Sequence, residues 1–129
     1  MAAFGIVRAL DLGFDEVLAR VPEALKAEGF GVLTEIDVQA TLKKKLDVDF
    51  RRYRILGACN PPFAHQALSH SLEIGMLLPC NVIVYETDEG QTVVSAVDPV
   101  QTMAARADPA VREIAEQVQA KLRRAIEAV

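Results

Sequence analysis

Two runs of β-branched residues around a short turn constrain the fold of this chain more than any other feature. The first run covers residues 82–86 and the second covers residues 92–97, with Asp88-Glu89-Gly90 between them. Two such runs separated by a short turn that contains glycine predict an antiparallel β-hairpin. An antiparallel hairpin in a chain that also has helices favours the α+β class.

Apolar periodicity and turn residues predict the elements on either side of the hairpin. Three strands are expected at residues 4–10, 30–36 and 53–59. A helix at residues 14–28 contains Pro22 and is followed by Gly29, and a second, short helix follows Asp37. A third helix is expected after Asn60, with Pro61 or Pro62 at its first position and Gly75 at its end. A short helical turn is expected to start at Asp98-Pro99. The last helix is expected to run from Asp108-Pro109 to residue 129.

The sequence predicts the N-cap residues of four helices and the buried face of the third helix. Asp37, Asn60, Asp98 and Asp108 are each expected to cap a helix, because their side chains accept hydrogen bonds from free N–H groups. The inward stripe of the third helix is expected to comprise Phe63 or Ala64, Ala67, Leu68, Ser71 and Leu72.

The order of elements predicts an α+β, two-layer helix-on-sheet domain. About five mostly antiparallel strands would be backed by the two long helices. The alternative is a doubly wound sheet in which the first three strands are parallel. With 129 residues, the chain is expected to form a single domain over residues 1–129.

Composition limits the classes of partner. The net charge is −4, which gives no electrostatic footprint for nucleic acid or for an anionic membrane. No apolar run approaches the ~20 residues that cross a bilayer, and no signal peptide is evident. In a chain that looks intracellular, two cysteines are expected to be free thiols and not a disulfide. A soluble, cytoplasmic protein is predicted.

Three separated blocks of sequence carry a resemblance to a known family. They are Phe30-Gly31-Val32-Leu33-Thr34-Glu35-Ile36-Asp37-Val38, Leu56-Gly57-Ala58-Cys59-Asn60-Pro61 and Gly75-Met76-Leu77-Leu78-Pro79-Cys80-Asn81-Val82. With these blocks, nearly the whole chain resembles the bacterial and archaeal family known as domain of unknown function 302. The resemblance implies a small α+β domain, similar in outline to half of the TATA-binding protein, and a homodimer. It implies no activity, and the acidic chain argues against carrying DNA binding across.

The candidate site is a pair of similar turns. Cys59-Asn60-Pro61 and Pro79-Cys80-Asn81 contain both cysteines of the chain, and His65 lies between them. Cys59 precedes a predicted helix, where free N–H groups stabilise a thiolate. Asn60 could donate a hydrogen bond to an oxyanion and His65 could act as a base. The alternative is that Cys59 is a buried core residue in an ordinary helix start.

The fold decides whether the two turns form one site. If strands 53–59 and 82–86 are antiparallel, Cys59 and Cys80 converge with Asn60 and Asn81 at one end of the sheet. If the strands are parallel, a strand length of roughly 17–20 Å separates the thiols. Convergence is the prediction.

The residue types indicate a soft ligand set without a closed zinc site. The cysteines are isolated, and His65 and His70 point to different sides of a helix, so four zinc ligands are not expected. Two thiolates would suffice for a soft ion such as Cu(I). No metal or cofactor is assigned.

The remaining charged residues are better explained by structural roles than by a binding site. Glu35 and Asp37 share a strand face and could form a carboxylate pair, although Asp37 is better explained as a helix cap. Lys43, Lys44 and Lys45 with Arg51, Arg52 and Arg54 are interrupted by Asp47 and Asp49, which favours a solvated face over an anion site.

Two function classes remain. Phosphate-loop, dinucleotide and nucleophile-elbow motifs are missing from the sequence, which favours a non-catalytic domain that binds a small ligand or a soft metal. Its expected ligand-binding residues are Cys59, Asn60, Cys80, Asn81 and His65. The alternative is a thiol-dependent enzyme or redox module that uses Cys59.

The strand sequences also predict assembly. Residues 82–85 are apolar at four successive positions, and 55–56, 93–94 and 96–97 place apolar side chains on both faces of a sheet. Because helices would cover only one face, a second copy is expected to cover the rest. The sequence predicts a homodimer with apolar strand residues or Met76-Leu77-Leu78 in its interface.

Overall fold

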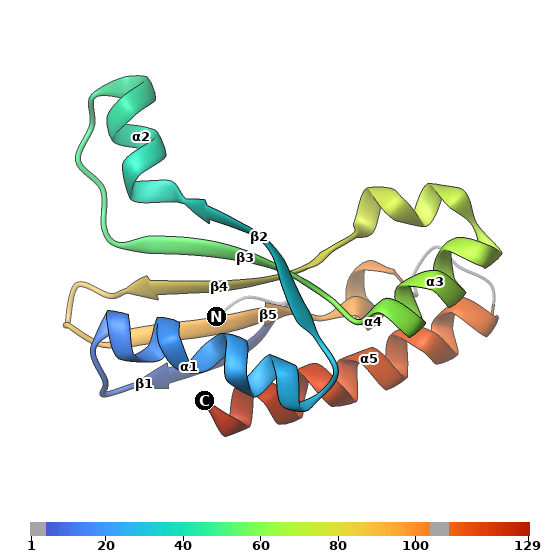
Figure 1. Ribbon diagram of the computed structural model, residues 1–129. Helices are drawn as coiled ribbons and strands as arrows, with labels where there is room; N and C mark the ends of the chain where they lie inside the picture. The colour runs from blue at the N-terminus through green and yellow to red at the C-terminus, as the bar shows by residue number, and fades with distance from the viewer. Residues whose placement is uncertain (1–4, 104–108) are drawn as a thin grey trace.

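The protein is an α+β structure with five strands and several helices (Figure 1). The computed structural model describes residues 5–103 and 109–129. The strands are β1 (Gly5–Leu10), β2 (Gly31–Asp37), β3 (Tyr53–Cys59), β4 (Cys80–Glu86) and β5 (Thr92–Val97). The α-helices are α1 (Phe14–Ala27), α2 (Val38–Leu46), α3 (Pro61–His70), α4 (Pro99–Thr102) and α5 (Pro109–Ala128), and the 3₁₀ helix η1 spans Leu72–Leu77. The element order predicted from the sequence is therefore confirmed, while the predicted positions of Phe4 and Asp108 lie outside the described residues.

All five strands form one antiparallel sheet in the order β1-β5-β4-β3-β2. The β4–β5 hairpin predicted from the β-branched runs is present, with Val84 opposite Val94. The alternative with parallel first strands is wrong. β1 does not pair with β2, because it lies at the opposite edge of the sheet next to β5.

The two long helices, α1 and α5, lie against the same face of the sheet (Figure 1). Each turns an apolar stripe toward it, as the 3.6-residue repeat of their buried positions indicates. Val17, Val21 and Leu25 of α1 meet Leu122 and Ile126 of α5 in one core cluster. Pro22 lies within α1, which continues through it as one helix.

The third predicted helix is shorter than expected. α3 ends at His70, and Gly75 lies within η1 and does not end α3. Ala67 is buried as predicted, but Leu72 is an exposed residue of η1 and does not belong to an inward stripe. The register of the apolar stripe is lost because the chain leaves helical geometry at Ser71, where φ is −156°.

Two predicted helix caps are confirmed. Asp37 accepts a hydrogen bond of 2.9 Å from the N–H of Ala40 at the start of α2. Asp98 accepts one of 2.9 Å from the N–H of Val100 at the start of α4.

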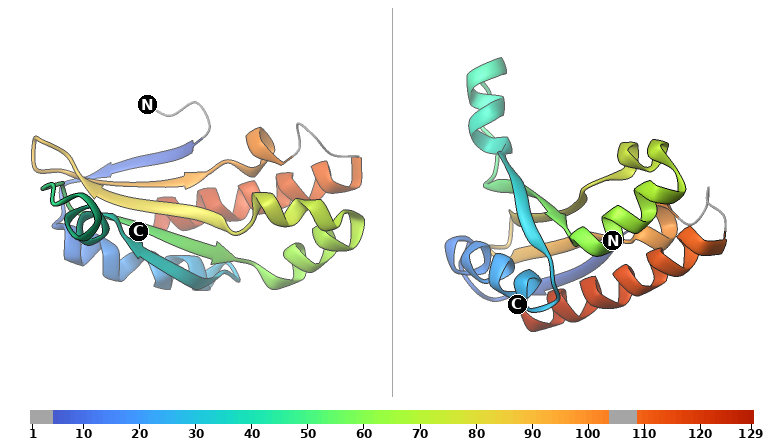
Figure 2. Two further views of the ribbon diagram at one scale, coloured as in Figure 1. Left: turned by 90° about the horizontal axis from the view of Figure 1, so that it is seen from above. Right: turned by 45° about the vertical axis from the view of Figure 1, so that its right-hand side comes forward.

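Two projections leave the body of the molecule at opposite ends of β3 (Figures 1 and 2). α2 rises beyond the end of the sheet where β3 begins, on the side away from α1 and α5. α3 and η1 lie at the other end, where β3 finishes. The candidate residues Cys59 and Asn60 belong to this second end.

Candidate functional site

Cys59 and Cys80 are neighbours across the β3–β4 ladder. Ala58 is the direct partner of Cys80, and Cys59 is the next residue along β3. Directly opposite residues on antiparallel strands have Cα atoms about 5 Å apart, so the two cysteine Cα atoms are separated by roughly 6 Å. The predicted convergence of the two turns is therefore confirmed, because β3 and β4 are antiparallel.

Both cysteines line a small cavity of about 30 Å³, which we call the thiol cavity. It lies between the end of the sheet, α3 and α5. Its lining consists of Phe30, Ala58, Cys59, Asn60, Phe63, Ala64, Ala67, Leu78, Pro79, Cys80, Pro99, Met103, Ile114 and Val118. The volume is that of about two water molecules, yet an apolar lining favours a dry cavity. Cys59, Cys80 and Asn60 are the lining residues whose side chains carry a thiol or an amide.

The two thiols differ in accessibility and in protonation. Cys80 is 7% exposed and belongs to the main core cluster, whereas Cys59 is only partly buried. Burial, followed by the neighbouring Cys59, raises the pKa of the Cys80 thiol to about 11. Cys80 is thus a protonated thiol at neutral pH, and it becomes a thiolate only when something replaces its proton.

The side chain of Asn60 is engaged elsewhere. Its amide nitrogen donates a hydrogen bond of 3.2 Å to the backbone carbonyl of Glu28, at the end of α1. No hydrogen bond from α3 reaches its side chain, so the predicted capping role is wrong. Tertiary contact explains the difference, because the buried amide meets the chain where it turns at Gly29, with φ of +88°. The same bond leaves Asn60 poorly placed as an oxyanion donor.

His65 and Asn81 lie outside the thiol cavity. His65 is an exposed residue of α3, and its backbone carbonyl accepts a hydrogen bond of 2.7 Å from Ser69. Asn81 is exposed and lies opposite Gly57, where it borders a separate groove with Met76 and Leu77. The cavity therefore unites Cys59, Asn60 and Cys80 from the predicted set and leaves out His65 and Asn81.

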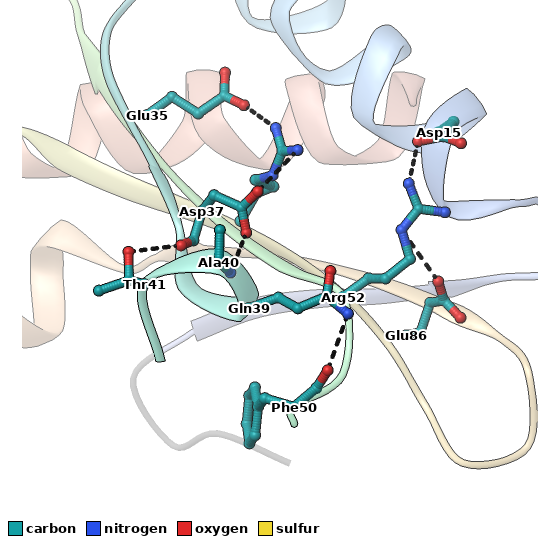
Figure 3. Close-up of polar contacts among 10 residues, drawn as sticks. Asp15, Glu35, Asp37, Gln39, Ala40, Thr41, Phe50, Arg52 and Glu86 are labelled. Atoms are coloured by element: carbon teal, nitrogen blue, oxygen red, sulfur yellow. Dashed lines mark hydrogen bonds and ion pairs between the residues drawn. The ribbon is translucent and has the colours of Figure 1, made fainter. Parts of the chain in front are cut away.

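Imidazole, thiol and carboxylate ligands for a three- or four-coordinate metal site are not grouped. Within residues 5–103 and 109–129, no cluster of three or more His, Cys, Asp or Glu side chains is placed to hold an ion. The Glu35 and Asp37 carboxylates (Figure 3) both form ion pairs with Arg54, which gives each of them a structural partner. Cys59 and Cys80 are the two potential thiolate ligands among the residues that line the thiol cavity.

Several lining residues were not singled out from the sequence. Phe30 and Met103 come from segments far apart in the chain, and no local pattern brings them together, whereas Phe63 is predicted only as a candidate for the inward stripe of α3. Ile114 and Val118 had a partial signal, because they belong to the continuous apolar face of α5. In the part of the chain that is described, no helix has the length and apolar character needed to cross a bilayer.

Comparison with known proteins agrees with this fold. The crystal structure of an uncharacterized conserved protein DUF302 from Bacillus stearothermophilus is 34% identical, with a TM-score of 0.90. The match covers 98% of this chain and 98% of that chain. A search of the curated proteins gave no match. The family model described as "Domain of unknown function DUF302" matches residues 6–129, so the chain belongs to the DUF302 family.

Proposed function

We propose that this protein is a non-catalytic binding domain and that the thiol cavity is its binding site. The observation that carries the proposal is that Cys59 and Cys80 both line one small, mostly apolar cavity. Sulfur ligands in an apolar, water-poor site suit soft ions.

The expected ligand is a soft monovalent metal ion such as Cu(I), held by the two sulfurs. A cavity of about 30 Å³ accommodates a bare ion, whereas a small organic ligand requires α3 to move away from α5. Cu(I) also needs fewer ligands than zinc, which is usually held by four. The second ligand class, a small apolar molecule, is favoured only by the apolar lining.

Proton release follows from this proposal. Since the pKa of Cys80 is raised to about 11, an ion must displace the thiol proton when it binds at neutral pH. The affinity therefore rises with pH, by about tenfold per unit for the one proton that leaves Cys80. This gives the site a signature that a surface-bound ion lacks.

The alternative function is a thiol-dependent enzyme or redox module that uses Cys59. Its support is the position of Cys59, a partly exposed thiol directly before α3. It lacks a positioned base, because His65 does not border the cavity, and Asn60 is bonded to Glu28. Binding is therefore the better-supported class.

An anaerobic titration with Cu(I) against a chromogenic Cu(I) chelator tests the proposal. We expect one ion per chain, an affinity that rises with pH, and a loss of at least tenfold in both Cys59→Ser and Cys80→Ser. If either variant bound Cu(I) as tightly as the wild-type protein does, the replaced cysteine would not be a ligand. That result would overturn the shared site. Turnover of a thiol-reactive substrate that depends on Cys59, without Cu(I) binding, would favour the enzyme.

The homodimer expected from the sequence remains a proposal. Its interface is expected to contain apolar strand residues or Met76-Leu77-Leu78, and sedimentation equilibrium at micromolar concentration tests it, because a monomer of 14.1 kDa would contradict it.

A further inference from the structure

A residue with a third sulfur atom borders the thiol cavity. Met103 directly follows α4 and lines the cavity together with Cys59 and Cys80. It is 5% exposed, so it is a core residue. Apart from Asn60, the other lining residues are Phe, Ala, Leu, Pro, Ile and Val, whose side chains are hydrocarbons. The lining therefore contains two thiols and one thioether.

Hydrogen bonds hold Met103 at the end of α4. Its backbone N–H donates a hydrogen bond of 2.7 Å to the carbonyl of Pro99, which also lines the cavity. Asp98, the cap of α4, is buried, and both of its carboxylate oxygens accept hydrogen bonds of 2.9 Å from the amide of Gln119 in α5. These contacts fasten α4 to α5 and fix the part of the chain that carries Met103.

Helix α5 supports two sides of the cavity. Met103 belongs to the same core cluster as Ala115 of α5. Cys80 belongs to the main core cluster, which also contains Ile114 and Val118 of this helix. Positions 114, 115 and 118 lie within about one turn of α5. One rigid helix thus sets the position of Met103 relative to Cys80.

Packing alone is the other explanation for a buried methionine, because its flexible side chain fills irregular gaps in a core. A residue with only that role is expected to close the gap beside it, whereas a cavity of about 30 Å³ remains next to Met103. Leucine has a similar volume and lacks sulfur. The two explanations therefore predict different results for Met103→Leu.

The sulfur of a thioether is a soft and uncharged ligand. Thiolates and thioethers both suit Cu(I), whereas carboxylates and carbonyls suit hard ions. A neutral third ligand adds no charge to an apolar cavity, where an uncompensated charge is costly. A thioether also has no proton to release when an ion binds. The third sulfur can therefore join two thiols as a ligand without a cost in charge or in protons.

We propose that Met103 is the third ligand of the ion, which is then held by the sulfurs of Cys59, Cys80 and Met103. The proposal rests on the function proposed for the thiol cavity, and it narrows the ligand to a soft monovalent ion that accepts three sulfurs. Within residues 5–103 and 109–129, His, Cys, Asp and Glu do not supply a third ligand. The thioether takes that coordination position.

The Cu(I) affinity of Met103→Leu tests the proposal, in the same chelator titration as the cysteine variants. We expect a loss of at least tenfold, equal at neutral and at mildly alkaline pH, because the thioether has no proton to lose. Circular dichroism verifies the fold, which a substitution that conserves volume should keep. Met76→Leu is the matched control. Met76 is 77% exposed and borders a separate groove, so this variant should bind Cu(I) as the wild-type protein does.

X-ray absorption at the copper edge gives a second measurement, which does not depend on the folding of a variant. The wild-type protein is labelled with selenomethionine and loaded with one equivalent of Cu(I). We expect selenium in the first coordination shell of copper. The selenium signal should be lost in labelled Met103→Leu and kept in labelled Met76→Leu.

The outcomes separate this proposal from the proposed function. Full Cu(I) affinity in a folded Met103→Leu protein, or a copper shell without selenium in the labelled wild-type protein, would overturn the role of Met103. Losses in the two cysteine variants would still support the thiol pair in that case. A wild-type protein that does not bind Cu(I) would overturn both proposals.

Discussion

The side-chain amide of Asn60 donates a hydrogen bond of 3.2 Å to the backbone carbonyl of Glu28, across 32 positions of sequence. This bond joins the end of α1 to the start of α3 beside the thiol cavity. Both partners are at least partly buried, so the bond replaces water that each would otherwise contact. The contact makes Asn60 a structural residue of the site.

Asn60→Ala should therefore destabilise the fold. The substitution leaves the Glu28 carbonyl without its donor, which costs about 1–3 kcal/mol of unfolding free energy. Asn81→Ala is the matched control, because Asn81 also follows a cysteine but is exposed, and it should change stability by less than about 0.5 kcal/mol. Urea unfolding measures both values. Equal losses in the two variants would mean that the Asn60 bond contributes nothing specific.

The two thiols should react with an alkylating reagent at different rates. Cys80 is 7% exposed and its pKa is raised to about 11, so its thiolate population at neutral pH is about 100-fold below that of a thiol with the ordinary value of 9.0. Iodoacetamide is expected to modify Cys59 first and Cys80 only as the protein unfolds. Peptide mass spectrometry over time gives the order. Modification of Cys80 at the rate of Cys59 in folded protein would contradict this assignment.

Stability should fall at alkaline pH because of Cys80. The pKa of its thiol is about 11 in the folded protein, above the ordinary value of 9.0, so the unfolded chain loses this proton first. The contribution is fully present below pH 9 and is lost as pH rises toward 11, with a total of about 2–3 kcal/mol. Urea unfolding between pH 8 and 11 measures this decline.

Cys80→Ala is the control for the alkaline effect. The pKa of Tyr53 is also raised, by burial and by Tyr85, but Tyr53 is present in both proteins. The difference between the two pH profiles therefore isolates Cys80. Parallel profiles for the wild-type protein and the variant would show that Cys80 does not cause the decline.

Gly57→Ala should strain the open side of β3. A Cβ atom at this position would lie 2.2 Å from Oγ1 of Thr34 and 2.7 Å from Cγ of Pro79. Neither contact is tolerable, and the proline ring has little freedom to move, so we expect a loss of about 1–3 kcal/mol in unfolding free energy. Gly31→Ala in β2 is the control, since nothing lies within 4 Å of its added Cβ. A Gly57→Ala protein as stable as Gly31→Ala would refute the close packing.

Local patterns explain what could be predicted of the fold. The β-branched runs identified the hairpin, and β3 was predicted with the bounds that the structure has, Tyr53–Cys59. The end of α3 was missed because Gly75 resembles a helix stop, whereas the helix already ends at His70. Backbone geometry at Ser71 decides this, and the sequence carries no clear signal for it.

The site depended on contacts that no local pattern contains. Convergence of the Cys59 and Cys80 backbones follows from an antiparallel arrangement of β3 and β4. The hydrogen bond from Asn60 to Glu28 and the exclusion of His65 from the cavity required the packing of α1 and α3. The two Cys-Asn pairs are alike in sequence, but Asn60 is buried whereas Asn81 is exposed.

Protection of Cys59 by one equivalent of Cu(I) tests the shared thiol site most directly. Iodoacetamide labelling of Cys59 is followed by mass spectrometry in the wild-type protein and in Cys80→Ala, each with a single equivalent of the ion. If both sulfurs hold one ion, labelling of Cys59 falls at least tenfold in the wild-type protein and much less in Cys80→Ala. Equal protection of Cys59 in the two proteins, or none in either, would contradict a site built from Cys59 and Cys80 together.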